Sequence, residues 1–74
     1  MKTQIFTAIV QKEDDGWTSL CPELDVASQG STIEEAKANL REAVELFLEV
    51  ASPSELDQRL RSETYLSQLE VTVG

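Results

Sequence analysis

The sequence contains no histidine, one cysteine and only six basic residues against fourteen acidic ones. Without histidine it lacks the commonest general base and metal ligand. A single cysteine cannot form an internal disulfide, which favours a reducing compartment. The net charge of −8 disfavours direct binding to nucleic acid, because the phosphates would be repelled. No apolar run approaches the roughly 20 residues of a membrane span.

The length leaves room for one small domain. A chain of 74 residues buries only about 60% of its unfolded surface when it folds, so its stability alone is expected to be marginal. The N-terminus carries no apolar signal-peptide stretch. We therefore expect a cytoplasmic, single-domain protein over residues 1–74, without a separate DNA-binding domain, whose acidity suits a basic partner.

The N-terminal half is predicted to form three strands joined by short turns. The segment Thr3–Lys12 is apolar on both faces at its centre, which is typical of a strand covered on both sides. Asp15-Gly16 is a hairpin signal, because glycine accepts positive φ. Further strands are expected over Trp17–Cys21, which Pro22 ends, and over Val26–Gln29.

A long helix is predicted over residues 32–51. Ser31 and Thr32 each precede a glutamate by three positions, which matches a capping box in either register. Apolar residues then recur at three- and four-residue steps and form one stripe, with Leu46 and Val50 beside it. The opposite face carries Glu34, Glu35, Glu42, Glu45 and Glu49.

Two more elements are expected after this helix. Ser52-Pro53 is a second helix start, because serine caps and proline is tolerated at the first helical position, and it predicts a short helix over residues 53–61. Apolar and polar residues alternate from Tyr65 to Val73, which predicts a final strand.

This order predicts an α+β fold, a two-layer sandwich with the order β-β-β-α-β. A strand–helix–strand passage between parallel strands would give a mixed sheet with the long helix on one face and the short helix as an addition. The other face, with Ile5 and Ile9, must then meet the short helix, a second copy or another protein. We expect self-association to at least a dimer, through this face or the helix edge at Leu46 and Val50.

The sequence offers no strong catalytic pattern. Cys21 has no histidine to pair with and is interpreted as a small buried hydrophobic residue. Three scattered glycines cannot build a phosphate loop. Asp14 and Asp15 could contribute to a magnesium or calcium site, but they are typical of a tight turn. We therefore predict no catalytic residue, no cofactor and no metal ion.

Two features can be explained either by structure or by binding. Trp17 can be a core aromatic residue, which we favour, or an exposed hot spot for a partner. The glutamates of the long helix are either a solvated face, which we favour, or an acidic docking face, towards which the charge of the whole chain leans.

A string of motifs between Ile5 and Glu49 resembles the HicB family of antitoxins. The motifs that carry this resemblance are Gly16-Trp17, Cys21-Pro22-Glu23-Leu24, Ser28-Gln29-Gly30 and Thr32-Ile33-Glu34-Glu35-Ala36. The combination is specific, although each motif alone is weak.

The resemblance implies a truncated RNase H-like fold and a role in neutralising a small, basic, RNA-cleaving toxin of the HicA family. Toxins of that family resemble double-stranded-RNA-binding domains and use a histidine. An acidic antitoxin could cover such a surface and compete with RNA for it. The expected partner-binding residues are Glu42, Glu45, Glu49, Leu46, Val50, Ile5 and Ile9.

The sequence departs from the family in two places. Asp25-Val26-Ala27 replaces a Pro-Gly-Cys stretch and shortens a loop. Many HicB proteins continue into a DNA-binding domain, whereas this chain ends at Gly74, so DNA binding is not expected. The first strand also lacks the carboxylate that RNase H enzymes place there, so two-metal hydrolysis lacks its first ligand.

Two alternatives to the antitoxin hypothesis are weighed. The chain could be an oligomeric interaction or regulatory module of the same fold without a toxin partner. It could also be a magnesium-dependent nuclease that uses Asp14 or Asp15, which the missing first-strand carboxylate disfavours. We therefore expect a protein that is not an enzyme.

Overall fold

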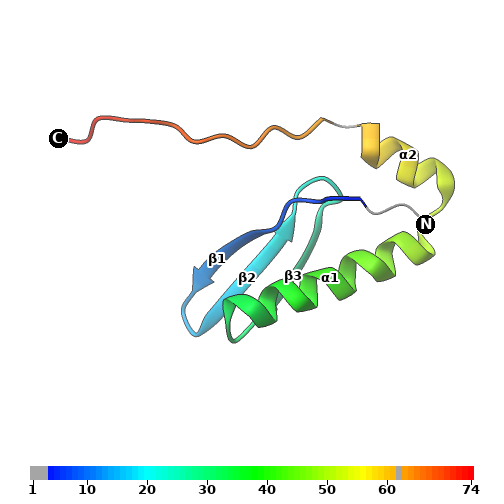
Figure 1. Ribbon diagram of the computed structural model, residues 1–74, viewed down its shortest axis with the longest axis horizontal. Coiled ribbons are helices and arrows are strands. Elements are labelled where there is room, and N and C mark those ends of the chain that lie inside the picture. The colour runs from blue at the N-terminus through cyan, green and yellow to red at the C-terminus, as the bar shows by residue number, and fades with distance from the viewer. Residues whose placement is uncertain (1–3, 62) are drawn as a thin grey trace.

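The computed structural model describes residues 4–61 and 63–74 and has an α+β fold (Figure 1). Its strands are β1 (Ile9–Glu13), β2 (Gly16–Cys21) and β3 (Val26–Gly30), and its helices are α1 (Ile33–Val50) and α2 (Pro53–Arg61). The strands form an antiparallel sheet in the order β1-β2-β3, and α1 packs along one face. The α+β class and both predicted helices are confirmed.

The hairpin between β1 and β2 forms where it was expected, but its glycine has another role. Glu13 pairs with Gly16, so the loop consists of Asp14 and Asp15. Gly16 does not have positive φ; the one positive φ among the described residues is 54° at Asp25. A Cβ on Gly16 would lie 2.8 Å from the carbonyl oxygen of Gly30, so glycine permits the close approach of two strands.

Strand β1 is shorter than expected. The predicted strand began at Thr3, which lies outside the described residues, and residues 4–8 form no strand. The partner strand β2 ends at Cys21, because Pro22 cannot donate to a ladder and the chain turns there. Residues 4–8 therefore have no strand beside them, and the Thr7 N–H is satisfied by the Glu23 carboxylate instead, at 2.9 Å.

Helix α1 is capped in the second of the two registers that the sequence allowed. Thr32 is the N-cap, and its hydroxyl accepts a hydrogen bond from the N–H of Glu35 at 3.0 Å. The Glu35 carboxylate accepts from the N–H of Ser31, also at 3.0 Å. Orphan donors at the start of the helix are thereby satisfied in both directions.

The core lies between α1 and the sheet and is small. Cys21, Leu24 and Leu40 form its buried cluster, and partly buried side chains that include Phe6 and Phe47 pack around it. Ser19 is also buried, and its hydroxyl donates a hydrogen bond to the Ala36 carbonyl at 2.9 Å. This bond satisfies a polar group that would otherwise be costly to bury.

The opposite face of the sheet carries no helix. The strand register places Ile9, Leu20 and Ala27 in one row across that face. α2 makes no extensive contact with any strand and lies beside the β2–β3 turn, where Arg59 donates a hydrogen bond to the Leu24 carbonyl at 2.6 Å. The prediction that one sheet face would remain uncovered by the long helix is confirmed.

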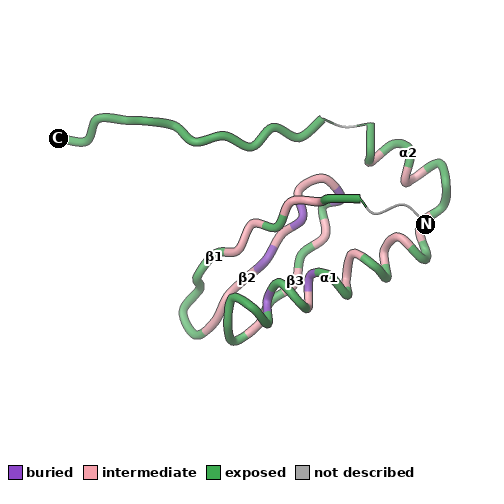
Figure 2. Tube along the Cα trace, viewed as in Figure 1, coloured by how far each residue is buried: buried purple, intermediate pink, exposed green. Residues whose placement is uncertain are grey.

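The predicted final strand is wrong in this structure. Residues 63–74 form no helix or strand, and every one of them is exposed (Figure 2). The sheet is therefore antiparallel rather than mixed, and the expected β-α-β passage is absent from the described residues. Alternation gives a segment two faces, but a strand also needs a neighbouring edge to pair with.

We predict that Thr32→Ala lowers the free energy of unfolding by about 1 kcal/mol, because it removes the N-cap acceptor. Ser31→Ala should change it by less than about 0.5 kcal/mol, because that hydroxyl does not cap the helix. Urea unfolding followed by circular dichroism measures both. Equal losses would contradict the register seen in the structure.

We also predict that Gly30→Ala destabilises the fold by about 1–3 kcal/mol. A Cβ on Gly30 would lie 2.5 Å from the Ala36 nitrogen, so α1 would have to move off β3. Gly74→Ala is the control, because its Cβ would meet nothing within 4 Å. Thermal unfolding curves that coincide for the two variants would be inconsistent with this close contact.

Candidate protein-docking surface

Five of the seven predicted partner-binding residues lie together on the outer face of α1. They follow one another at helical spacing and are all exposed, and they comprise Glu42, Glu45, Leu46, Glu49 and Val50. Leu46 is 60% exposed and Val50 73%. We call this set the acidic stripe, and it combines three carboxylates with two apolar side chains on one rigid element.

The carboxylates of the acidic stripe have no cationic partners in the described part of the chain. The ion pairs found there both lie within α2, between Arg59 and Glu55 at 3.8 Å and between Arg61 and Asp57 at 3.1 Å. The last turn of α1 also contains no basic residue. Among the described residues, the carboxylates of the stripe are therefore not engaged in ion pairs and are available to a basic partner.

The other two candidate residues lie elsewhere. Ile5 is 94% exposed in the segment before β1. Ile9 is half-buried and belongs to the row on the open sheet face. The structure therefore leaves Ile9 apart from the acidic stripe, whereas Ile5 and Glu45 of the stripe both line one groove between residues 4–8 and α1.

A groove that sequence reasoning missed lies between residues 4–8 and α1. It has a volume of about 780 Å³, and Cys21, Leu40 and Val44 are among its apolar lining residues. Lys37 and Arg41 also line it. It exists because α1 packs mainly on β3 and β2 and least on β1. No local pattern could reveal it, since its walls come from distant parts of the sequence.

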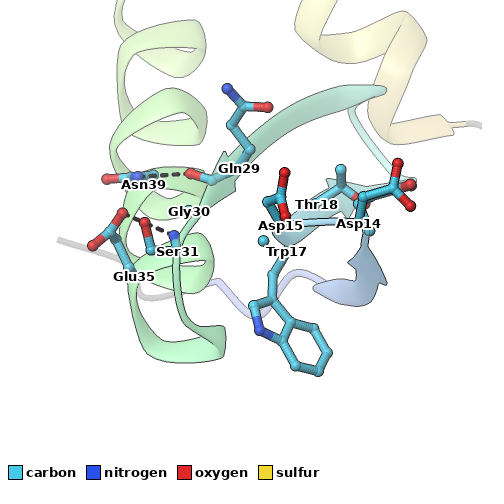
Figure 3. Close-up of a pocket in the computed structure, with 11 residues that line it drawn as sticks. Asp14, Asp15, Trp17, Thr18, Gln29, Gly30, Ser31, Glu35 and Asn39 are labelled. Carbon is cyan, nitrogen blue, oxygen red and sulfur yellow. Dashed lines mark hydrogen bonds between the residues drawn. The ribbon is translucent and has the colours of Figure 1, made fainter.

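A shallow polar pocket lies where the hairpin turn meets the start of α1 (Figure 3). Asp14 and Asp15 both line it, but their carboxylates lie apart. Within the described residues, no group of three or more His, Cys, Asp or Glu side chains could hold a metal ion. Trp17 lies at this pocket half-buried, with the Lys12 ammonium 5.5 Å from its ring centroid, so its predicted place in the core is wrong.

The Glu23 carboxylate connects the segment before β1 to the β2–β3 turn. It accepts hydrogen bonds from the N–H and the hydroxyl of Thr7, at 2.9 and 2.7 Å, and from the Cys21 thiol at 3.6 Å. Partial burial raises the pKa of Glu23, but the bonds from Thr7 and its neighbours outweigh burial and hold that pKa below its ordinary value. Burial also raises the pKa of the Cys21 thiol, as expected for a structural cysteine.

Curated proteins similar to this chain share one family name. UPF0150 protein ssl0738 of Synechocystis sp. is 44% identical over 50 residues, which cover 66% of this chain and 69% of that protein. The chain belongs to the UPF0150 family. A UPF0150 protein of Helicobacter pylori is 29% identical over 68 residues, 90% of this chain and 94% of its own length. UPF0150 protein ssr1765 of Synechocystis sp. is 46% identical over 46 residues, 60% of this chain and 58% of that protein.

Other comparisons give no further match for this UPF0150 chain. No family model matches it, and no solved structure does. Within the described residues, neither helix is long and apolar enough to cross a membrane.

We predict that Glu23→Gln destabilises the fold by about 1–2 kcal/mol at pH 7, because it removes a charged acceptor from Thr7. The stability that this carboxylate contributes is present above the ordinary glutamate pKa of about 4.5 and is lost as pH falls through the lower folded-state pKa. The difference between wild type and variant should therefore narrow below about pH 4.5.

Urea unfolding between pH 3 and pH 7 measures this difference (a range that runs from roughly 1.5 units below to roughly 2.5 units above the ordinary carboxyl pKa). Glu13→Gln is the matched control, because that exposed side chain makes no hydrogen bond in the described structure. A difference for Glu23→Gln that does not change with pH would contradict the assigned role.

Proposed function

We propose that this UPF0150 protein is a HicB-like antitoxin, or toxin-binding module, that masks a small, basic, HicA-like ribonuclease in the cytoplasm. The observation that carries the proposal is the acidic stripe on α1, whose carboxylates are exposed and form no ion pair with any residue that the structure describes. The motifs that resemble HicB proteins support it. The net charge of −8 adds to the attraction for a basic partner.

The stripe suits two stages of binding. Its carboxylates would attract a basic RNA-binding surface at long range and speed the encounter. Leu46 and Val50 are then placed to lose water against the toxin, and such buried contacts slow dissociation. The antitoxin would act by occupying the surface that RNA needs, which requires no bond chemistry, cofactor or metal ion on its own side.

The test is a triple charge reversal, Glu42→Lys with Glu45→Lys and Glu49→Lys. The association rate constant with a HicA-like toxin, encoded by a gene next to the gene of this protein, should fall about 10–100-fold at low salt. The reason is that the variant lacks the electrostatic attraction that steers the encounter. Surface plasmon resonance measures the rates, and an RNA-cleavage assay measures the loss of inhibition. Raising the salt concentration should shrink the difference from wild type.

The matched control reverses three other exposed acids, Glu13, Asp15 and Glu34, and so makes the same change in net charge. This control should keep most of the wild-type association rate, since those acids lie outside the stripe. Circular dichroism of each variant checks that the fold is retained. Equal effects of the two triple variants, or no association of the wild-type pair at micromolar concentration, would refute the proposal.

A second candidate function follows from the open sheet face. Ile9, Leu20 and Ala27 form an apolar row that no helix of the described chain covers. An oligomeric interaction module without a toxin would use such a face between copies. A stable homo-oligomer, together with no short basic reading frame beside the gene, would favour this function over the antitoxin.

A further inference from the structure

Residues 63–74 extend from the folded body and expose apolar side chains that a monomer would normally bury. The side chains of Tyr65, Leu69, Val71 and Val73 are 95%, 90%, 70% and 92% exposed. The radius of gyration is 14.4 Å, against about 11 Å for a compact domain of this length. Exposed apolar side chains concentrated in one segment mark an interaction site. We call residues 63–73 the tail.

The sheet has one edge that lacks a partner and one that is partly covered. At β3, the Asn39 side-chain amide donates a hydrogen bond to the Gln29 carbonyl at 2.7 Å, and the first turn of α1 lies against Gly30 (Figure 3). At β1, the outer edge meets no strand or helix in the described structure. Alternate N–H and C=O groups of β1 therefore face outward and remain available for another strand.

The groove lies beside residues 4–8, which lead directly into β1, and it matches the tail in character. Its apolar lining suits the tail residues with odd numbers, since alternate side chains of an added strand would point into it. The charged lining residues are Lys37, Arg41 and Glu45, so the two cations outnumber the one carboxylate at the groove. The ionisable side chains of the tail include Glu63 and Glu70. The free edge and the groove thus both suit an extended segment with apolar side chains on one face.

The tail of the same copy follows a helix whose end lies close to residues 4–6, but the tail does not occupy the β1 edge. Arg59 holds the end of α2 to the body through the Leu24 carbonyl and lies 5.5 Å from the Phe47 ring centroid. Leu60 and Arg59 share a depression with residues 4–6, so the tail begins near the segment that precedes β1. It nevertheless runs past the body without packing on it, and each of its residues is exposed (Figure 2).

We infer that two copies exchange tails: residues 63–73 of each copy add as a strand to the free β1 edge of the other and fill its groove. The arrangement is reciprocal, so two-fold symmetry closes it at a dimer. Hydrogen bonds to β1 fix the strand, and the odd-numbered apolar side chains lose their contact with water. The row on the open face stays outside this contact, and of the acidic stripe only Glu45 lies at the groove.

The first experiment measures mass by light scattering at about 100 μM protein, where weak dimers show, and about 0.15 M salt, which screens the repulsion between acidic copies. Wild type should be a dimer. Leu69→Lys with Val71→Lys should raise the dimer dissociation constant about 100-fold or more, because charge would enter the groove. Gln68→Lys with Thr72→Lys is the control and should remain dimeric, since those side chains point away from it.

The second experiment locates the contact in mixed dimers. Unlabelled protein carrying a nitroxide on Thr72→Cys is mixed with ¹⁵N-labelled wild type; the buried Cys21 thiol, whose pKa burial raises, labels slowly. Amide signals of β1 in the ¹⁵N copy should broaden. A monomeric wild type, or a dimer whose broadening falls on α1 or the open face instead of β1, overturns the inference. Neither result bears on toxin binding, which the stripe variants test separately.

Discussion

The close contact of the first turns of α1 with β2 and β3 is the constraint on which the rest of the structure depends. Gly30 lets the helix approach so closely that any Cβ there would overlap the backbone at Ala36. Ser19 adds a buried hydrogen bond to the same turn of the helix. Because the core is small, few other contacts could replace this one, and the position of the helix across the sheet follows from it.

That position explains both surfaces that we connect with function. A helix held against β3 leaves the β1 side of this sheet face uncovered, which creates the groove. The strand edge without a partner lies on the same side, because β1 is an outer strand of the sheet. The orientation of α1 about its own axis buries Ala36 and Leu40 and at the same time points the acidic stripe to solvent. This follows because residues three and four positions apart share a face of a helix. The packing of α1 against β3 and β2 thus gives the molecule both an acidic surface for a basic partner and an apolar edge suited to a second copy.

Sequence reasoning succeeded where the signal was local. Thr32 and Ser52 cap the helices that they were expected to start. It failed where the outcome depended on distant neighbours. Trp17 lies half-buried at a polar pocket, because the start of α1 and β3, rather than the core, surround it. The groove beside β1 could not be anticipated, since it arises from the distance between two elements.

The sequence by itself determined the helices, their caps, the hairpin and the acidic face of α1, because each depends on spacing within a few residues. Only the tertiary structure decided whether the two outer segments form strands. Residues 4–8 and 63–74 have strand-like patterns, yet neither is a strand, since neither segment is paired with a neighbouring strand within its own copy. It also decided that Gly16 and Gly30 allow two backbone segments to approach each other closely, instead of forming a turn. That role depends on the backbone of another element, which local sequence does not reveal.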